Sequence, residues 1–420
     1  MVKKDNMETN FLSGFPPYAE LSANEPVEPG SYVFEANCHI HTPYSFSAFD
    51  DLDTVFRMAK EERIDALGIN DFYVSDGYES FHKGCISNNI FPLFNIEFIG
   101  LLKEEQSKGI RINDPNNPGR IYFCGKGLDF PFHLSDKNLR LLSGVKVESQ
   151  CQLRAMVSKL NRLIAEGGSK LSLDFDQIRK RFAKELVRER HIAKAVRYLA
   201  SENFSKDEDR MSFIESLYGG KRSKQSFADA AALENEIRSN ILKAGGTAFV
   251  EEDERSFLPL GAIKEIILDA GGIPCYPVLL DDPSGKFTEF EGSFEKLYDS
   301  LTSMGVGCIE LIPGRNALNI LSDFVSFFDS RDFIVTFGTE HNTPEMIPLT
   351  VTARGGTDLT WKLEEVNRRG VCVIAAHQYF HAQKMEGYTD AAGKPRKNMK
   401  KEFEAAGQAV IEFYLRDKQI

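Results

Sequence analysis

The sequence Asn37-Cys38-His39-Ile40-His41-Thr42 contains a His-x-His pair and follows the apolar run Tyr32-Val33-Phe34. Alternate side chains of an extended strand point to the same face, so His39 and His41 are predicted to project together. Two imidazoles on one face form half of a divalent-metal site, because neutral histidine suits zinc, iron and manganese. Two ligands alone do not make a site, and a solvated strand face is the alternative interpretation.

Composition narrows the class of protein. The chain has 420 residues, of which 42% are hydrophobic and 27% charged, which is enough for one large α/β domain with an insertion or for two domains. The apolar runs are too short for a membrane span or a secretory signal, and the seven cysteines form no CxxC pair, so a cytoplasmic protein without membrane contact is expected. The net charge of −11 and the lack of a basic run argue against binding nucleic acid.

The apolar pattern predicts alternating strands and helices from residue 31 to about 125, with the strands in a buried, largely parallel sheet. Carboxylates in Asp50-Asp51-Leu52-Asp53 indicate the start of the first helix. Further strands are predicted around residues 65–69, 91–98 and 121–125. The pattern resumes later with strands at 273–276, 307–311 and 333–337, and an apolar strand is predicted at 371–375 before a final helix at about 399–415.

Residues 137–244 have long, charged helical patterns and little strand signal, which predicts a helical insertion overhanging the end of a barrel. We therefore expect an N-terminal extension at 1–30, a barrel built from 31–136 and 245–345, and a C-terminal extension at 346–420 that completes the barrel or packs on it.

Polar side chains recur where predicted strands end. Besides the histidine pair, they are Asp71, Glu97, Glu340 and His341. Independent polar substitutions would not collect repeatedly at strand ends, so a shared site is predicted.

In this order the motifs resemble the PHP family, the polymerase and histidinol phosphatase metal-dependent phosphoesterases. The resemblance covers most of residues 31–345, and it rests on these segments: His39-Ile40-His41-Thr42-Pro43-Tyr44-Ser45, Gly68-Ile69-Asn70-Asp71-Phe72, Glu97, Arg188-Glu189-Arg190-His191-Ile192-Ala193, Ala270-Gly271-Gly272-Ile273-Pro274-Cys275-Tyr276-Pro277, and Gly338-Thr339-Glu340-His341. It implies an α/β fold, a distorted seven-stranded, TIM-like β/α barrel with a helical insertion and with metals at the strand ends.

Several positions depart from the family pattern. Tyr276 and Tyr122 stand where ligand histidines are expected, Phe72 and Phe46 replace further ligands, and the final Asp has become Glu340. Phenylalanine cannot bind a cation, and neutral tyrosine is a poorer ligand than imidazole. A multinuclear site is therefore not expected.

The ligands that remain are His39, His41, Glu97 and Glu340, and we expect them to form a single site that holds one divalent ion (zinc, iron or manganese) per chain. The implied activity is hydrolysis of a small, anionic, phosphorylated substrate by a metal-activated water, with Asp71 or His341 managing the proton. The alternative is a PHP-derived binding or regulatory protein that has lost hydrolysis.

Arg190, His191 and Tyr276 are the candidate substrate contacts, with a solvated helix face as the equal alternative for the first two. His377 and His381 have helical i, i+4 spacing, which leaves open a second metal or substrate contact or a polar surface turn. His133, a lone histidine among apolar residues, is predicted to lie in the core.

Overall fold

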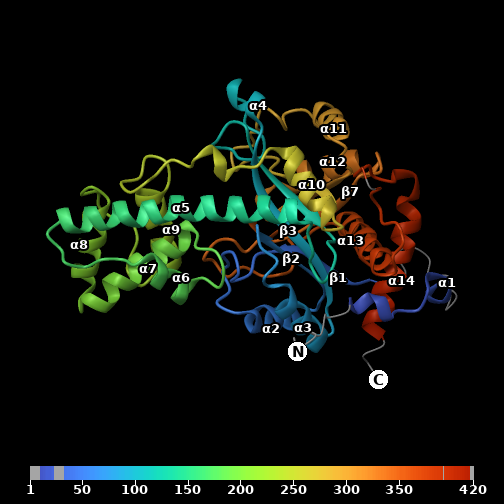
Figure 1. Cartoon of the computed structure of the whole chain (residues 1–420), viewed down its shortest axis with the longest axis horizontal. Helices are drawn as coiled ribbons and strands as arrows, with labels where there is room; N and C mark the ends of the chain where they lie inside the picture. The colour runs from blue at the N-terminus through green and yellow to red at the C-terminus, as the bar shows by residue number, and fades with distance from the viewer. Residues whose placement is uncertain (1–9, 23–32, 391, 417–420) are drawn as a thin grey trace.

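Seven strands form one α/β barrel, in agreement with the predicted fold. The computed structural model describes residues 10–22, 33–390 and 392–416, so residues 1–9 and 23–30 of the expected N-terminal extension lie outside the described residues. The strands pair in chain order, with helices packed around the sheet (Figure 1). They are β1 (Glu35–Ile40), β2 (Ile64–Phe72), β3 (Phe91–Leu101), β4 (Arg120–Lys126), β5 (Ile273–Val278), β6 (Cys308–Leu311) and β7 (Ile334–Phe337).

One strand runs against the others. The pairs β1–β2, β2–β3, β5–β6 and β6–β7 are parallel, but β4 is antiparallel to both β3 and β5. The sheet is therefore largely parallel, as expected, and β4 is the exception. The connection from β3 contains only the short helix α4 (Lys103–Ser107) and returns the chain beside the same strand, an arrangement typical of antiparallel neighbours.

The barrel closes between β1 and β7 in two different ways. Toward the carboxyl ends of these strands, the Glu340 amide donates to the His39 carbonyl and the His41 amide donates to the Glu340 carbonyl, each at 2.8 Å. Below this bridge a helical side chain fills the seam. Asn367 Oδ1 accepts from the Phe337 amide at 2.8 Å, and its Nδ2 donates to the Ala36 carbonyl at 3.1 Å.

Helices that follow the strands pack their apolar faces on the sheet. The first begins as predicted, since Asp51 caps it by accepting from the Thr54 amide and Asp53 lies in its first turn. These helices are α2 (Leu52–Glu61), α3 (Tyr78–Asn88), α10 (Leu260–Asp269), α11 (Phe294–Ser303) and α12 (Leu318–Asp329).

The run Val371–Ala375 lies within helix α13 (Trp361–Ala382), so the strand predicted there is wrong. Its residues are 0–3% exposed because α13 is covered on all sides, and an apolar run buried all round cannot be assigned to strand or helix by periodicity. Glycines allow α13 to lie close to its neighbours on two sides. A Cβ on Gly370 of α13 would lie 2.1 Å from the Val335 carbonyl oxygen of β7. A Cβ on Gly407 of α14 (Lys400–Arg416) would lie 1.7 Å from the Cys372 carbonyl oxygen of α13.

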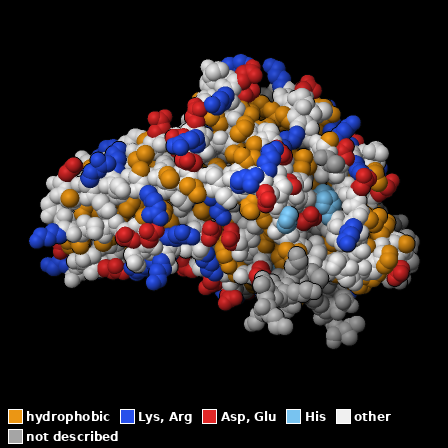
Figure 2. Space-filling model, viewed as in Figure 1, with side chains coloured by type: hydrophobic (Ala, Val, Ile, Leu, Met, Phe, Trp, Pro, Cys, Tyr) orange, Lys and Arg blue, Asp and Glu red, His pale blue; other side chains and the backbone are white. Residues whose placement is uncertain are grey.

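Residues 136–242 are helical and build a separate apolar core, consistent with their charged helical pattern. The long α5 carries this arm away from the barrel, and both signs of charge are spread over the face drawn in Figure 2. The arm returns to the barrel where the Leu186 amide donates to the Tyr44 carbonyl, in the loop after β1. Its helices are α5 (Asp136–Glu166), α6 (Phe175–Phe182), α7 (Glu189–Asn203), α8 (Asp207–Leu217) and α9 (Ala230–Ile237), followed by the π-helical turn Arg238–Leu242.

Within the described residues, we find no helix with the length and apolar character needed to cross a lipid bilayer.

Candidate metal centre

Three predicted ligands converge inside the barrel. His39 and His41 come from the end of β1, and Glu97 comes from β3, opposite Phe72 at the end of β2. The Nε2 atoms of the two histidines lie 3.2 Å apart, and Glu97 Oε2 lies 3.1 Å from His41 Nε2 and 3.8 Å from His39 Nε2. All three side chains are buried. The structure therefore brings together three of the four ligands expected from the sequence.

Hydrogen bonds behind the imidazoles orient both Nε2 atoms toward this point. His39 Nδ1 lies 2.7 Å from Glu310 Oε1, and His41 Nδ1 lies 3.3 Å from Ser45 Oγ, which donates to Asp71 Oδ1 at 2.6 Å. The Glu310 carboxylate can only accept, so His39 Nδ1 carries the proton and donates to it. The Ser45 hydroxyl uses its proton in the hydrogen bond to Asp71, so it accepts from His41 Nδ1 in the same way. Each Nε2 then keeps a lone pair, and the one on His39 accepts from Asn70 Nδ2 at 3.0 Å. A second layer of oxygens commonly fixes metal-binding histidines in this way.

Burial also keeps the imidazoles neutral. It lowers the pKa of His41 to about 3, and the Arg188 guanidinium lowers that pKa further. Burial likewise lowers the pKa of His39, against the opposing effect of the Glu310 carboxylate. Burial raises the pKa of Glu97 to about 7. A cation near all three would stabilise the carboxylate form of Glu97 without competing with protons on the rings.

The three atoms fit one divalent ion. A tetrahedral ion with bonds of about 2.0–2.1 Å separates its ligand atoms by roughly 3.3 Å. The observed separations of 3.2, 3.1 and 3.8 Å bracket that value. Glu97 Oε2 is buried and accepts no hydrogen bond from any described residue. A buried carboxylate oxygen without a donor is costly unless a cation meets it, so the donor set suits a zinc-, iron- or manganese-like ion.

Glu340 does not join this group. Its carboxylate pairs with the Arg315 guanidinium, and its backbone, rather than its side chain, closes the barrel. Glu340 and His341 both have positive φ, 70° and 55°, which directs their side chains away from a regular strand-end geometry. The expectation that Glu340 would be the fourth ligand is not met, because a neighbouring loop supplies a competing cation.

His341 and Asp71, the candidates for proton transfer, are occupied by structural hydrogen bonds. His341 Nε2 donates to the Ile347 carbonyl at 2.9 Å, and its Nδ1 accepts from Thr339 Oγ1 at 2.8 Å. Asp71 accepts from the Thr42 amide, the Thr42 hydroxyl and the Ser45 hydroxyl. Burial raises the pKa of Asp71 to about 6 despite these bonds. Asp71 therefore anchors the loop after β1 and orients His41 through Ser45.

Tyr276, expected at the substrate, points elsewhere. Its hydroxyl donates to Glu291 Oε1 at 2.7 Å, and Glu291 also accepts from the amides of Leu279 and Leu280. Both side chains are fully buried. The pair fixes the loop after β5, and the predicted substrate contact is not found.

The insertion presents a different arginine from the one expected. Arg190 donates to Asn235 Oδ1 at 2.6 Å, and buried His191 accepts from the Arg188 amide at 2.9 Å while its ring meets Phe46. Both predicted contacts thus stabilise the insertion. Arg188 is the residue that reaches inward, with its guanidinium 4.7 Å from the centre of the Phe72 ring.

Aromatic rings take up space beside the ligands. Phe72 stacks on the His41 ring at 4.8 Å between centroids, and Tyr122 lies 6.2 Å from Phe72. These are two of the positions where the sequence departs from the family pattern. The Phe72 and Tyr122 rings fill space next to the histidine pair, and neither can contribute an imidazole ligand.

The remaining histidines lie away from the group. Buried His377 donates to the Gly271 carbonyl at 2.6 Å and accepts from the Tyr388 amide at 2.9 Å, while His381 pairs with Asp129 at 3.0 Å. Neither interpretation left open for this pair describes His377, which is buried within α13 with both ring nitrogens hydrogen-bonded to backbone groups, so it has a packing role. His133 is exposed, so the prediction of a core position is wrong.

Two functional residues were missed in the sequence. Lys126 and Glu310 are both fully buried, and Lys126 Nζ lies 2.5 Å from Glu310 Oε2. Burial by itself would lower the pKa of Lys126, but the Glu310 carboxylate outweighs this effect and raises it. A signal was present, because Glu310 interrupts the otherwise apolar strand Cys308–Leu311, and charged residues are almost never fully buried unless paired.

Comparison with known proteins agrees with this architecture. No protein-family model matches the chain. DNA polymerase III alpha subunits from several Staphylococcus aureus strains are 37% identical to it over 62 residues, which is 14% of this chain and 6% of each relative's length. The chain therefore matches only a small part of these relatives.

Two solved structures are similar over most of their length. One is described as a metal-dependent phosphoesterase from Bifidobacterium adolescentis, with a TM-score of 0.51, 15% identity, and coverage of 78% of this chain and 94% of that one. The other is an amidohydrolase from Chromobacterium violaceum, with a TM-score of 0.48, 16% identity, and coverage of 79% and 96%. The first likeness shows a shared fold. With its motif order and its barrel, the chain resembles the PHP family of metal-dependent phosphoesterases, with several metal-ligand positions altered.

Proposed function

We propose that this chain is a metal-dependent phosphoesterase that hydrolyses a small phosphorylated substrate at the point where His39, His41 and Glu97 converge. The observation that carries the proposal is the convergence itself: two Nε2 lone pairs and an unpartnered carboxylate oxygen, with separations that suit one divalent ion. Three protein ligands leave a coordination position for water or substrate, as in catalytic rather than structural sites.

A divalent ion held there would polarise a phosphoryl oxygen and lower the pKa of a water, so that hydroxide is available near neutral pH. The chain's own residues prepare the site for this chemistry. Glu310 and the Ser45–Asp71 pair hold the two imidazoles in one tautomer. Phe72, stacked on His41, excludes water from one side of the ring.

Two arginines suit an anionic substrate. Burial lowers the pKa of His41 and the Arg188 charge lowers it further. Burial raises the pKa of Glu97 and the Arg315 charge opposes that rise, so both guanidinium groups lie near the proposed site. The Arg315 side chain is 44% exposed, and the guanidinium of Arg188 has no carboxylate partner among the described ion pairs. Guanidinium groups bind phosphate oxygens in pairs, so these residues would orient the phosphoryl group and favour its negative charge.

The second candidate is a phosphate-ligand binding protein without turnover. One observation favours it: Asp71 and His341, the expected proton carriers, are both committed to hydrogen bonds with neighbouring loops. Such a protein would still hold a metal and an anion.

One experiment separates the candidates. The purified protein is analysed for metals and then assayed on phosphomonoester and phosphodiester panels with zinc, manganese or iron(II) added. Turnover that is lost in both His39→Ala and His41→Ala, and retained in the exposed His133→Ala control, supports the esterase. Tight binding of inorganic phosphate without turnover supports the binding protein. Absence of any bound metal refutes both.

A further inference from the structure

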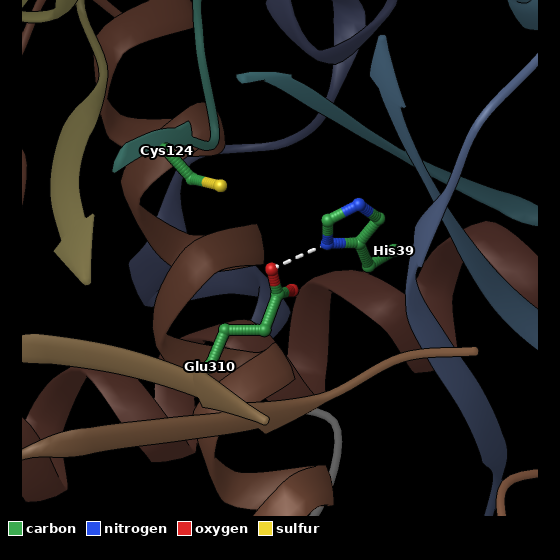
Figure 3. Close-up of side chains that lie close together, drawn as sticks. All are labelled: His39, Cys124 and Glu310. Carbon is green, nitrogen blue, oxygen red and sulfur yellow. Dashed lines mark hydrogen bonds and ion pairs between the residues drawn. The ribbon is translucent and has the colours of Figure 1, made fainter. Parts of the chain in front are cut away.

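A second group of metal-ligand side chains lies beside the first and shares one member with it. Atoms of His39, Cys124 and Glu310 lie within 4.8 Å of one another, and all three residues are buried. Glu310 points at His39, and the Cys124 sulfur is directed into the same space (Figure 3). Imidazole, thiolate and carboxylate together are a donor set that suits zinc or cobalt.

A lysine already supplies a positive charge here. The ammonium group of Lys126 contacts three acceptors, Glu310 Oε2 at 2.5 Å, Asn70 Oδ1 at 3.2 Å and the Cys38 carbonyl at 3.4 Å. An ammonium group has three protons, so these contacts satisfy it. Cys124 and Lys126 are two residues apart on β4 and therefore share a face of the strand.

The Lys126 charge excludes a second cation from the group. One oxygen of Glu310 accepts from Lys126 and the other from His39 Nδ1, so its negative charge is already balanced. A divalent ion bound to Cys124 and Glu310 would meet the ammonium group in a fully buried region, where low dielectric strengthens repulsion. The same contacts hold the His39 ring so that only Nε2 faces the first site.

We propose that Lys126 is a built-in cation that takes the place of a second metal ion, and that replacing it with a neutral residue turns His39, Cys124 and Glu310 into a metal site. The inference rests on the proposed function in that His39 also belongs to the metal site proposed there.

Binding of a metal ion to the Lys126→Met protein releases two protons. The incoming ion displaces the proton of the Cys124 thiol and the proton on His39 Nδ1, and both are released to solvent. The ion forms bonds to sulfur, to Nδ1 and to a Glu310 oxygen that Lys126 no longer occupies. A metal bound to a thiol removes its proton outright, so the burial of Cys124 does not prevent this.

Cobalt(II) is the probe, because its bond to a thiolate produces a charge-transfer absorption band in the near ultraviolet. Metal-free protein is titrated with cobalt(II), and the band and the bound metal per chain are recorded for four proteins: the unmodified chain, Lys126→Met, Lys126→Arg, and Lys126→Met combined with Cys124→Ser. We expect a thiolate band and one additional cobalt in Lys126→Met. The unmodified chain, the charge-retaining Lys126→Arg and the protein lacking Cys124 should show no band.

The outcomes separate the two hypotheses. If the unmodified chain binds one cobalt without the band and Lys126→Met gains nothing, the inference is overturned while the proposed metal site stands. If only Lys126→Met binds cobalt, with the band, the inference stands and the proposed site fails; if neither binds, both fail. Circular dichroism checks folding. Should Lys126→Met not fold, the neutral Lys126→Gln replaces it in the same titration. A thiolate band in the unmodified chain that Cys124→Ser abolishes overturns the inference.

Discussion

The Nε2 atoms of His39 and His41 lie 3.2 Å apart, much closer than same-face side chains of a regular strand. The pairing of β1 with β2 shifts register between Asn37 and Ile40, so the strand is irregular at the point that carries the two rings. A single ion can therefore contact both.

We predict at most one tightly bound transition metal per chain, because only three predicted ligands converge and Lys126 occupies the neighbouring group. His39→Ala should remove this metal, since it deletes one of three ligands. Tyr276→His alone should not add one, because Tyr276 points at Glu291. Elemental analysis of the purified proteins measures this, with His133→Ala as the control. Two or three metals in the unmodified chain would refute the prediction.

Lys126→Met should destabilise the metal-free protein by about 3–5 kcal/mol, because it leaves the Glu310 carboxylate buried without its cation. Chemical denaturation in the presence of a chelator measures the free energy of unfolding. Combining Lys126→Met with Glu310→Gln removes both charges and should recover much of the loss. Equal stability of the single and double variants would contradict the assigned pairing.

Arg188→Ala and Arg315→Ala should each raise KM for a phosphorylated substrate, or Kd for inorganic phosphate, by roughly 10- to 100-fold. The estimate follows from about 1.5–3 kcal/mol for a hydrogen bond to a charged group. Arg57→Ala is the matched control, because Arg57 is 61% exposed and pairs with Glu61 on α2. Unchanged binding in both variants would exclude the arginines from the substrate site.

His377 should make stability depend on pH. Burial lowers its pKa from 6.5 to about 3 in the folded protein. The unfolded chain therefore binds the proton first, so the contribution is present above pH 6.5 and is lost as pH falls toward 3, at about 1.4 kcal/mol per pH unit. His377→Gln should flatten the decline of the unfolding free energy in this window by that amount. The exposed His133→Gln is the control, and an unaltered slope in His377→Gln would refute the assignment.

Asn367→Ala should cost about 2–6 kcal/mol, because it leaves the Phe337 amide and the Ala36 carbonyl without partners, each at about 1–3 kcal/mol. Asn367→Asp keeps the acceptor for Phe337 but places a carboxylate oxygen against the Ala36 carbonyl in a buried seam, so we expect it to be destabilised as well. Denaturation midpoints compare the three proteins. Equal midpoints would show that the seam between β1 and β7 does not depend on this side chain.

The order of strands and the first three ligands could be predicted from the sequence because both depend on local pattern. Short apolar runs separated by helical periodicity predict the barrel strands. Polar residues near the ends of the strand expected to carry the histidine pair and of the strand expected at residues 91–98 predict that His39, His41 and Glu97 meet, because the carboxyl ends of parallel strands lie at one edge of the sheet. In the structure β3 continues to Leu101, and Glu97 lies opposite Phe72 at the end of β2.

Other features depend on which segments become neighbours, and no local pattern contains that information. The antiparallel β4 brings Lys126 to Glu310, and the loop after β6 brings Arg315 to Glu340, which removes the expected fourth ligand. The run at 371–375 is helical because α14 and the strands cover it on every side. By itself the sequence determined the alternating strands and helices and the histidine pair, through periodicity and residue chemistry. Only the tertiary structure decided which charges face one another, because a buried charge takes its partner from whatever segment the fold places within a few ångströms.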